Sequence, residues 1–217
     1  MRSLKVLAAV VAALAVSVGT LYADFTPISA PDAAYLASTT KIAIPGPYGY
    51  TPIAGVSDGT ESVTFSGACA AIMIRGGDWA TWSDPPFAEA PAGSAFPGVY
   101  SGGATLVTLT LGVPTQTFGV EMEPNPFAIH GMTADFYNGA TLVGSVSIPV
   151  DGQAGARLFA GGTTTDQFTS VVLSSDVDFA FSQIRYGGAG QIPEPSVLVL
   201  LGLGVVALGR RLRKRVA

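Results

Sequence analysis

Short runs of β-branched and aromatic residues, separated by turn residues, dominate the middle of this 217-residue sequence. From about Ser62 onward, Gly, Pro, Asn and Asp interrupt these runs at intervals of roughly ten residues, a spacing typical of an all-β fold. Between the two ends of the chain no stretch shows a convincing 3.6-residue apolar period, and no repeat recurs at a fixed period. The pattern predicts a two-layer β-sandwich.

The clearest predicted strand lies within residues 104–111, where apolar residues and threonines alternate strictly from Val107 to Leu111. Such alternation places the apolar side chains on one face of a strand and the threonines on the other. Residues 116–122, 168–174 and 178–186 are three further predicted strands. The sandwich therefore has candidates for both of its sheets.

A hairpin is predicted where residues 132–137 and 141–148 flank the dipeptide Asn138-Gly139. This dipeptide tolerates positive φ and suits a type I′ turn, so the two flanking strands are expected to pair antiparallel. Four prolines in residues 84–98 predict a long loop.

The chain divides by composition into four parts. Residues 24–60, with several Pro, Gly and Ala and few long apolar runs, are interpreted as an N-terminal edge segment, and residues 61–191 as the β-sandwich domain. Residues 1–23 carry two early cations, then an uncharged apolar run of about a dozen residues and smaller residues leading to Ala23, the order of a secretory signal peptide. A buried core helix is the alternative, but the run lacks a polar face.

Residues 192–217 form the fourth part. Pro193, Glu194 and Pro195 precede an apolar run that ends at Gly209. The two prolines keep the chain extended ahead of the following helix, so the triplet is accessible to a processing enzyme. A helix of fifteen residues spans roughly 22 Å against about 30 Å of hydrocarbon, which is short for a stable membrane span. The chain then closes with a basic cluster of Arg210, Arg211, Arg213, Lys214 and Arg215.

The basic cluster predicts the orientation of this tail. Cationic ends of membrane segments stay cytoplasmic, so the C-terminus is expected inside and the preceding domain outside. Export through the N-terminal signal peptide gives the same topology.

The order of Pro-Glu-Pro, one apolar segment and a terminal basic cluster resembles the PEP-CTERM sorting signal of Gram-negative bacteria. The resemblance covers residues 192–217 and implies recognition by exosortase after export, with signal peptidase acting at the other end. It also implies association with extracellular polysaccharide and a place in the cell envelope or matrix, after transient anchoring in the inner membrane. An ordinary C-terminal anchor, which would keep its apolar segment, is the alternative.

Residues 115–186 look like the lectin-like or jelly-roll domains that often precede this tail. The resemblance rests on the stretches "TFGVEME", "GATLVGSVSIPV" and "FAFSQIRYG". Ser182 and Gln183 depart from the acidic or asparagine-containing strand of many relatives. A metal or sugar site is therefore not transferred.

The region between the two ends is acidic. Residues 24–192 hold four lysines and arginines against fourteen carboxylates, a net charge of about −10, whereas the whole chain carries −4. Such a surface repels nucleic acid and anionic lipid. Both are excluded as expected ligands.

The sequence predicts no catalytic residue and no metal ligand. His130, the single histidine, follows the turn-rich Pro124-Asn-Pro126 and is expected to be a solvated loop residue. Cys69, the single cysteine, forms no internal disulfide and is interpreted as a small buried hydrophobe rather than a nucleophile. Zinc and Ser-His-Asp chemistry are not supported.

Two acidic pairs leave calcium open as a cofactor. Glu121 and Glu123 lie two apart on one strand face, and Asp176 and Asp178 flank Val177 in a predicted turn. Calcium needs six to eight oxygens from several segments, and neither pair matches an EF-hand. A solvated acidic face is the favoured interpretation, with a calcium site as the alternative.

The most ligand-like cluster is Asp78, Trp79, Trp82 and Asp84. Sugars stack on indole faces while carboxylates accept their hydroxyls, so these residues could form a carbohydrate platform. The alternative, that the tryptophans cap an open edge of the sandwich, is favoured.

These observations predict a non-catalytic exported surface or matrix protein associated with exopolysaccharide. A calcium-dependent carbohydrate-binding module is the rival hypothesis. A hydrolase with an unrecognised carboxylate pair is a third.

Overall fold

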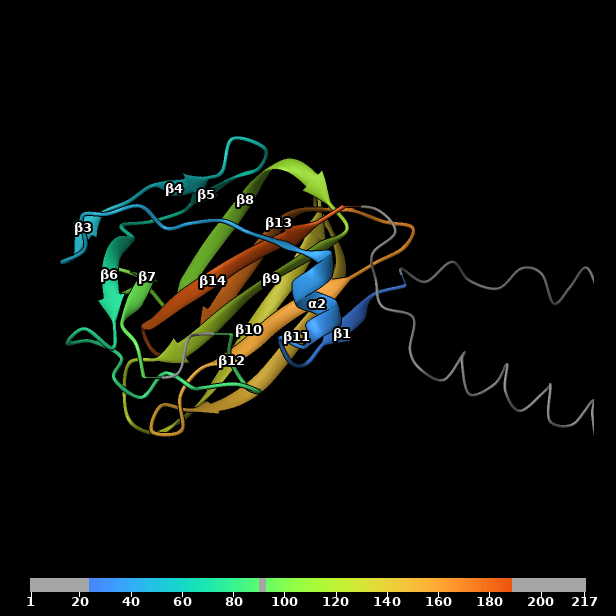
Figure 1. Cartoon of the computed structure of the whole chain (residues 1–217). Helices are drawn as coiled ribbons and strands as arrows, with labels where there is room; N and C mark the ends of the chain where they lie inside the picture. The colour runs from blue at the N-terminus through green and yellow to red at the C-terminus, as the bar shows by residue number, and fades with distance from the viewer. Residues whose placement is uncertain (1–23, 90–92, 189–217) are drawn as a thin grey trace, which may run out of the picture.

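Figure 1 shows two antiparallel β-sheets packed face to face in the computed structural model of the chain, which describes residues 24–89 and 93–188. The predicted two-layer β-sandwich is therefore confirmed. The expected signal peptide, residues 1–23, and the expected sorting tail, residues 192–217, lie outside the described residues.

The larger sheet has eight strands in the spatial order β1-β12-β9-β14-β7-β6-β3, and β2 pairs with β14 beside this path. Their bounds are Thr26–Ile28 (β1), Arg157–Gly162 (β12), Thr117–Pro124 (β9), Phe179–Gly187 (β14), Phe96–Tyr100 (β7), Ala70–Ile74 (β6), Thr51–Pro52 (β3) and Thr40–Lys41 (β2).

The smaller sheet has six strands in the order β11-β10-β13-β8-β5-β4. They span Thr141–Asp151 (β11), Ile129–Asn138 (β10), Phe168–Ser175 (β13), Leu106–Thr115 (β8), Ser62–Phe65 (β5) and Gly55–Ser57 (β4). The N-terminal edge segment, residues 24–60, contributes β1, β2, β3 and β4. Strands β1, β3 and β4 lie at the ends of the strand order, whereas β2 pairs with β14.

The core between the sheets follows the predicted alternation. On β8, Val107, Leu109 and Leu111 are at most 7% exposed, and all three belong to the main apolar cluster. On β9, Phe118 and Met122 enter the same cluster. Inward residues of both sheets interlock in this way because side chains of a strand alternate between its two faces.

The predicted hairpin is confirmed, but its turn differs from the prediction. Strands β10 and β11 pair antiparallel along their whole length, and Asn138 lies opposite Thr141 at the end of the ladder. Gly139 has φ +59°, whereas neither Asn138 nor Ala140 is among the described non-glycine residues with positive φ. A type I′ turn needs two successive positive φ values, so the expectation of that turn is wrong.

Two further local expectations need correction. Helix α2, residues Ala33–Ser38, was not predicted, since six residues are too few to show a helical period. Asp32 caps it by accepting a hydrogen bond from the Tyr35 amide at 2.8 Å. The expected loop over residues 84–98 ends earlier, because β7 begins at Phe96 and pairs with both β6 and β14.

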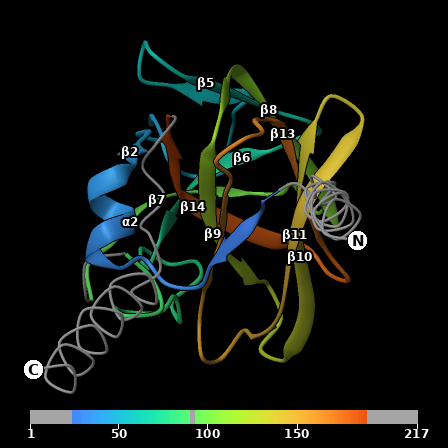
Figure 2. The same ribbon diagram turned by 90° about the vertical axis from the view of Figure 1, so that its right-hand side faces the viewer.

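The outward face of the larger sheet is covered as well. Figure 2 shows α2 on the side of β14 and β9 that faces away from β10 and β11. Tyr35 of this helix packs with Leu158 and Ala160 of β12. A second apolar cluster, which includes Ile74, Trp82 and Ala180, forms farther along the same face. The sheet is therefore buried on both sides over much of its area.

Candidate functional site: a pocket at one end of the sandwich

Residues 75–89 connect β6 toward β7 and fold across the outward face of the larger sheet. Trp82, at 3% exposure, is buried there among Ile72, Phe96 and Ala180. Because the indole ring covers strand residues that would otherwise face water, this connection acts as part of the fold rather than as a free loop.

The two tryptophans of this segment attach it to β9. The Trp82 indole Nε1 donates to Glu121 Oε2 at 2.9 Å, and the Trp79 Nε1 donates to the backbone carbonyl of Glu123 at 3.3 Å. Trp79 itself has φ +43°, a conformation that few non-glycine residues adopt. Strained residues of this kind persist where the surrounding contacts fix them.

Glu121 and Glu123 share one strand face, as expected, but that face is not solvated. Their side chains lie under the covering segment, in residues that are 0% and 1% exposed. The expectation of a solvated acidic face is therefore wrong at these positions. Strand alternation assigns side chains to a face and does not show what covers that face.

Burial changes the acidity of both carboxyls. It raises the pKa of Glu121 from the ordinary 4.5 to about 7, against the opposing hydrogen bonds from the Glu89 amide and the Trp82 indole. Burial also raises the pKa of Glu123 to about 7, although Thr81, Arg75 and Arg157 act in the opposite direction. Removing a carboxylate from water disfavours its charged form, which is the larger effect here.

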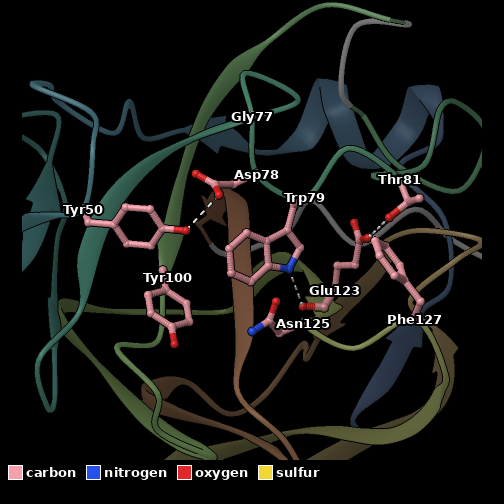
Figure 3. Close-up of a pocket in the computed structure, with 9 residues that line it drawn as sticks. All are labelled: Tyr50, Gly77, Asp78, Trp79, Thr81, Tyr100, Glu123, Asn125 and Phe127. Atoms are coloured by element: carbon pink, nitrogen blue, oxygen red, sulfur yellow. Dashed lines mark hydrogen bonds between the residues drawn. The ribbon is translucent and has the colours of Figure 1, made fainter.

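Beside this buried pair, a pocket of about 290 Å³ opens at the end of β9 where Pro124 lies. Figure 3 shows its lining, with the Trp79 indole between two tyrosines on one side and Glu123 on the other. The lining residues come from four separate stretches of chain, and they are Tyr50, Gly77, Asp78, Trp79, Thr81, Tyr100, Glu123, Asn125 and Phe127.

Hydrogen bonds hold several polar groups of the pocket in place. The Tyr50 hydroxyl donates to Asp78 Oδ1 at 2.9 Å. The Tyr100 hydroxyl and the Asn125 amide donate to the same oxygen of Asp178, at 2.8 and 2.9 Å. Burial, followed by the Asp178 carboxylate, raises the pKa of Tyr100 to about 12, so this hydroxyl stays a donor. The pocket is thus ordered before any ligand enters.

The structure separates the four residues of the predicted platform. Asp78 and Trp79 line the pocket, whereas Trp82 is buried outside it. Asp84 forms an ion pair with Arg75 at 2.6 Å and is likewise outside the lining. Trp79 therefore lines the pocket, whereas Trp82 covers the outward face of the larger sheet.

Most of the lining was missed by sequence reasoning. Tyr50, Tyr100 and Phe127 are single aromatic residues far apart in the sequence, and no spacing connects them. Only the turn-rich Pro124-Asn-Pro126 stretch marks the end of β9 as a place where strand gives way to loop.

His130 does not lie in a loop, so the expectation of a solvated loop histidine is wrong. It belongs to β10, its side chain is 14% exposed, and its Nδ1 lies 3.0 Å from Asp176 Oδ1. Cys69 is buried, as expected, and burial raises the pKa of its thiol to about 11. Neither residue lines the pocket.

Within residues 24–89 and 93–188, no group of three or more His, Cys, Asp or Glu is placed to hold a metal ion. Over the same part of the chain, none of the helices is both long and apolar enough to cross a membrane.

Comparison with known proteins identifies the end of the chain. The family model of the PEP-CTERM protein-sorting motif matches residues 191–214. No curated protein matches the chain. The protein thus belongs to the class of exported proteins that are transiently anchored in the membrane. More particularly, it is a β-sandwich protein that carries a PEP-CTERM motif and is sorted by exosortase.

Proposed function

We propose that this protein is a non-catalytic surface or extracellular-matrix protein that associates with exopolysaccharide through the pocket at the end of the sandwich. The aromatic lining of that pocket is the observation that carries the proposal. Four of its residues are aromatic, namely Tyr50, Trp79, Tyr100 and Phe127.

This lining suits a sugar chain. Sugar rings present apolar C–H faces that stack on aromatic rings, and hydroxyls that need hydrogen-bonding partners. Tyr50 and Phe127 are 49% and 66% exposed, so their rings are available to a ligand. Asp78 and Asn125 supply polar groups beside them. A pocket of this composition binds a hydroxylated ligand better than a purely apolar one.

The position of the pocket supports display away from the membrane. Strand β14 pairs with β9 so that Phe179 lies opposite Pro124 at the pocket end, while Gly187 lies opposite Thr117 at the other end. The chain leaves the sandwich after Gly187, toward the sorting motif. An eight-residue strand is about 26 Å long, so the pocket and the chain exit lie at opposite ends of the domain (Figure 1).

The remaining parts of the proposal concern processing and destination. Signal peptidase removes residues 1–23, and the domain is displayed outside with the C-terminus cytoplasmic until exosortase acts. The final location is the cell envelope or extracellular matrix. The positive-inside rule supports this topology, since five cations follow the apolar segment.

Tyr50→Ala and Tyr48→Ala give a matched test. Both tyrosines are exposed, at 49% and 36%, but only Tyr50 lines the pocket. Full-length protein in mild detergent is co-sedimented with exopolysaccharide from the producing cells, with and without a calcium chelator. We expect Tyr50→Ala to release the protein and Tyr48→Ala to retain it.

Three results would contradict the proposal. Equal retention of both variants would remove the pocket from the interaction, and loss of binding in chelator would favour the calcium-dependent module. Release of reducing ends from the polysaccharide by the wild-type protein would show a hydrolase.

A further inference from the structure

The pocket contains one buried polar atom without a partner. Glu123 Oε2 has no hydrogen bond within the described structure, although the residue is 1% exposed and belongs to the pocket lining. A buried acceptor left unpaired costs free energy, and such atoms often mark a place that a ligand fills. The other oxygen of this carboxyl is held by Thr81.

The contacts of Thr81 indicate the protonation state of Glu123. Thr81 Oγ1 lies 2.6 Å from Glu123 Oε1 and 2.8 Å from the carbonyl oxygen of Gly152. A threonine hydroxyl has one proton, and a carbonyl can only accept. Both contacts are full hydrogen bonds when Thr81 donates to Gly152 and a protonated Glu123 donates to Thr81, whereas an ionised Glu123 would have to share the single Thr81 proton with Gly152.

This arrangement fixes what Glu123 offers to a ligand. With its proton directed to Thr81 from Oε1, the carboxyl has only an acceptor left at Oε2. The charged groups near it are Arg75, which follows β6, and Arg157 of β12, which both act on its acidity, and Asp78 across the pocket. Burial raises the pKa of Glu123 to about 7, so the protonated form predominates at pH 6.

We propose that Glu123 is the ligand-recognising residue of this pocket and that the ligand is a neutral sugar unit, whose hydroxyl donates to Oε2 while its ring packs on Trp79. This inference rests on the proposed function and specifies its ligand. Phe127, which also belongs to the lining, is 66% exposed.

The lining also excludes acidic sugars. Asp78 and Glu123 are the carboxyl residues among the lining, and neither lysine nor arginine is part of it. A uronate would place its carboxylate against Asp78 without a cation to neutralise either group. The net charge of about −10 over residues 24–192 adds long-range repulsion of polyanions.

The test uses full-length protein in mild detergent and two matched probes, galactose oligosaccharides and galacturonate oligosaccharides of the same length and linkage. Glucose and mannose oligosaccharides complete the neutral set. We expect binding of at least one neutral probe at pH 6 and at least tenfold weaker binding of the galacturonate probe.

Three variants separate recognition from folding. Glu123→Ala removes the acceptor and should weaken the best neutral probe about tenfold, the value of one hydrogen bond. Glu123→Gln keeps a donor toward Thr81 and a carbonyl at the Oε2 position, so it should bind within about twofold of wild type. Glu61→Gln, which changes a buried glutamate outside the pocket, is the control and should bind as wild type. Thermal unfolding verifies that each variant is folded.

The outcomes distinguish this inference from the proposed function. Wild-type affinity in a folded Glu123→Ala variant, or preference for galacturonate, overturns the inference but leaves exopolysaccharide association standing. A Glu123→Gln variant as weak as Glu123→Ala shows that the carboxyl is ionised and overturns the assigned hydrogen bonding. Failure to bind any probe and failure to co-sediment with exopolysaccharide overturn both.

Discussion

The free energy of unfolding should fall as the pH rises from about 4.5 to about 7, because Glu121 and Glu123 are buried as protonated acids. Burial raises the pKa of each carboxyl from 4.5 to about 7. A group whose pKa is higher in the folded state stabilises the fold fully at any pH below its unfolded pKa. This stabilisation is lost as the pH rises through the folded pKa. Such a shift corresponds to about 3 kcal/mol for each carboxyl.

On the acid side this stabilisation is limited by carboxyls whose pKa is lowered in the folded protein. Burial alone would raise the pKa of Glu89, but hydrogen bonds and charges from Arg185 and Lys41 outweigh it and lower the pKa. The stabilisation from Glu89 is therefore present above the unfolded pKa and is lost as the pH falls through the lower, folded one. Stability should consequently be greatest near pH 5 and lower both at pH 3 and at pH 8.5.

Glu123→Gln tests this reasoning at one position. Glutamine imitates the protonated acid and has no proton to lose, so the variant should equal wild type at pH 5 and exceed it by about 3 kcal/mol at pH 8.5. Urea unfolding followed by tryptophan fluorescence at both pH values measures the difference.

Glu121→Gln provides the contrast. Both oxygens of Glu121 accept N–H donors, from Trp82 and from the Glu89 amide, so a glutamine NH₂ would face one of these donors. This variant should lose stability at both pH values. Wild-type protein with equal stability at pH 5 and pH 8.5 would refute the burial of protonated carboxyls, as would a Glu123→Gln variant that keeps the whole wild-type pH dependence.

Three further predictions concern the turn, the new N-terminus and the tail. Gly139→Val should lower the free energy of unfolding by about 1–2 kcal/mol and the Tm by several degrees, because φ is +59° at this position. Gly139→Asn should cost less, because asparagine tolerates positive φ better. An unchanged Tm for the valine variant would rule out this strain. N-terminal sequencing of surface-located protein should begin near Asp24, whose carboxylate accepts hydrogen bonds from the Thr163 hydroxyl and the Thr164 amide, and recovery of the intact initiator methionine would contradict it. Glu194→Ala should leave unprocessed precursor in the membrane fraction on immunoblots, and processing at the wild-type rate would contradict the sorting role of this residue.

The sequence was sufficient to predict the strands that alternate. From Val107 to Leu111 every second residue is buried, and the turn near Gly139 joins two strands that pair antiparallel. Period-two patterns depend on a strand's own geometry and on one buried face, so they can be recognised locally. Helix α2 has too few residues to show a period, and its single buried residue, Tyr35, gives no pattern.

The pocket could be predicted only in part, because it depends on contacts distant in sequence. Asp78 and Trp79 belong to the four-residue cluster that the sequence offered as a carbohydrate platform, although capping of an open edge was the favoured interpretation. Glu123 was interpreted as solvated because nothing in β9 indicates that residues 75–89 fold over its outward face. Tyr50 reaches the pocket from a segment more than seventy residues before Glu123, and no local pattern records that approach.

The most direct test of the account is mass spectrometry of the surface-located protein, since the proposed processing takes place within the sorting motif over residues 191–214. The account predicts that the C-terminal peptide ends near Pro193 to Pro195 and that the basic cluster is absent from the surface form. Recovery of residues 210–217 still attached at full stoichiometry would show that the tail is a permanent anchor, and the sorting account would then be wrong.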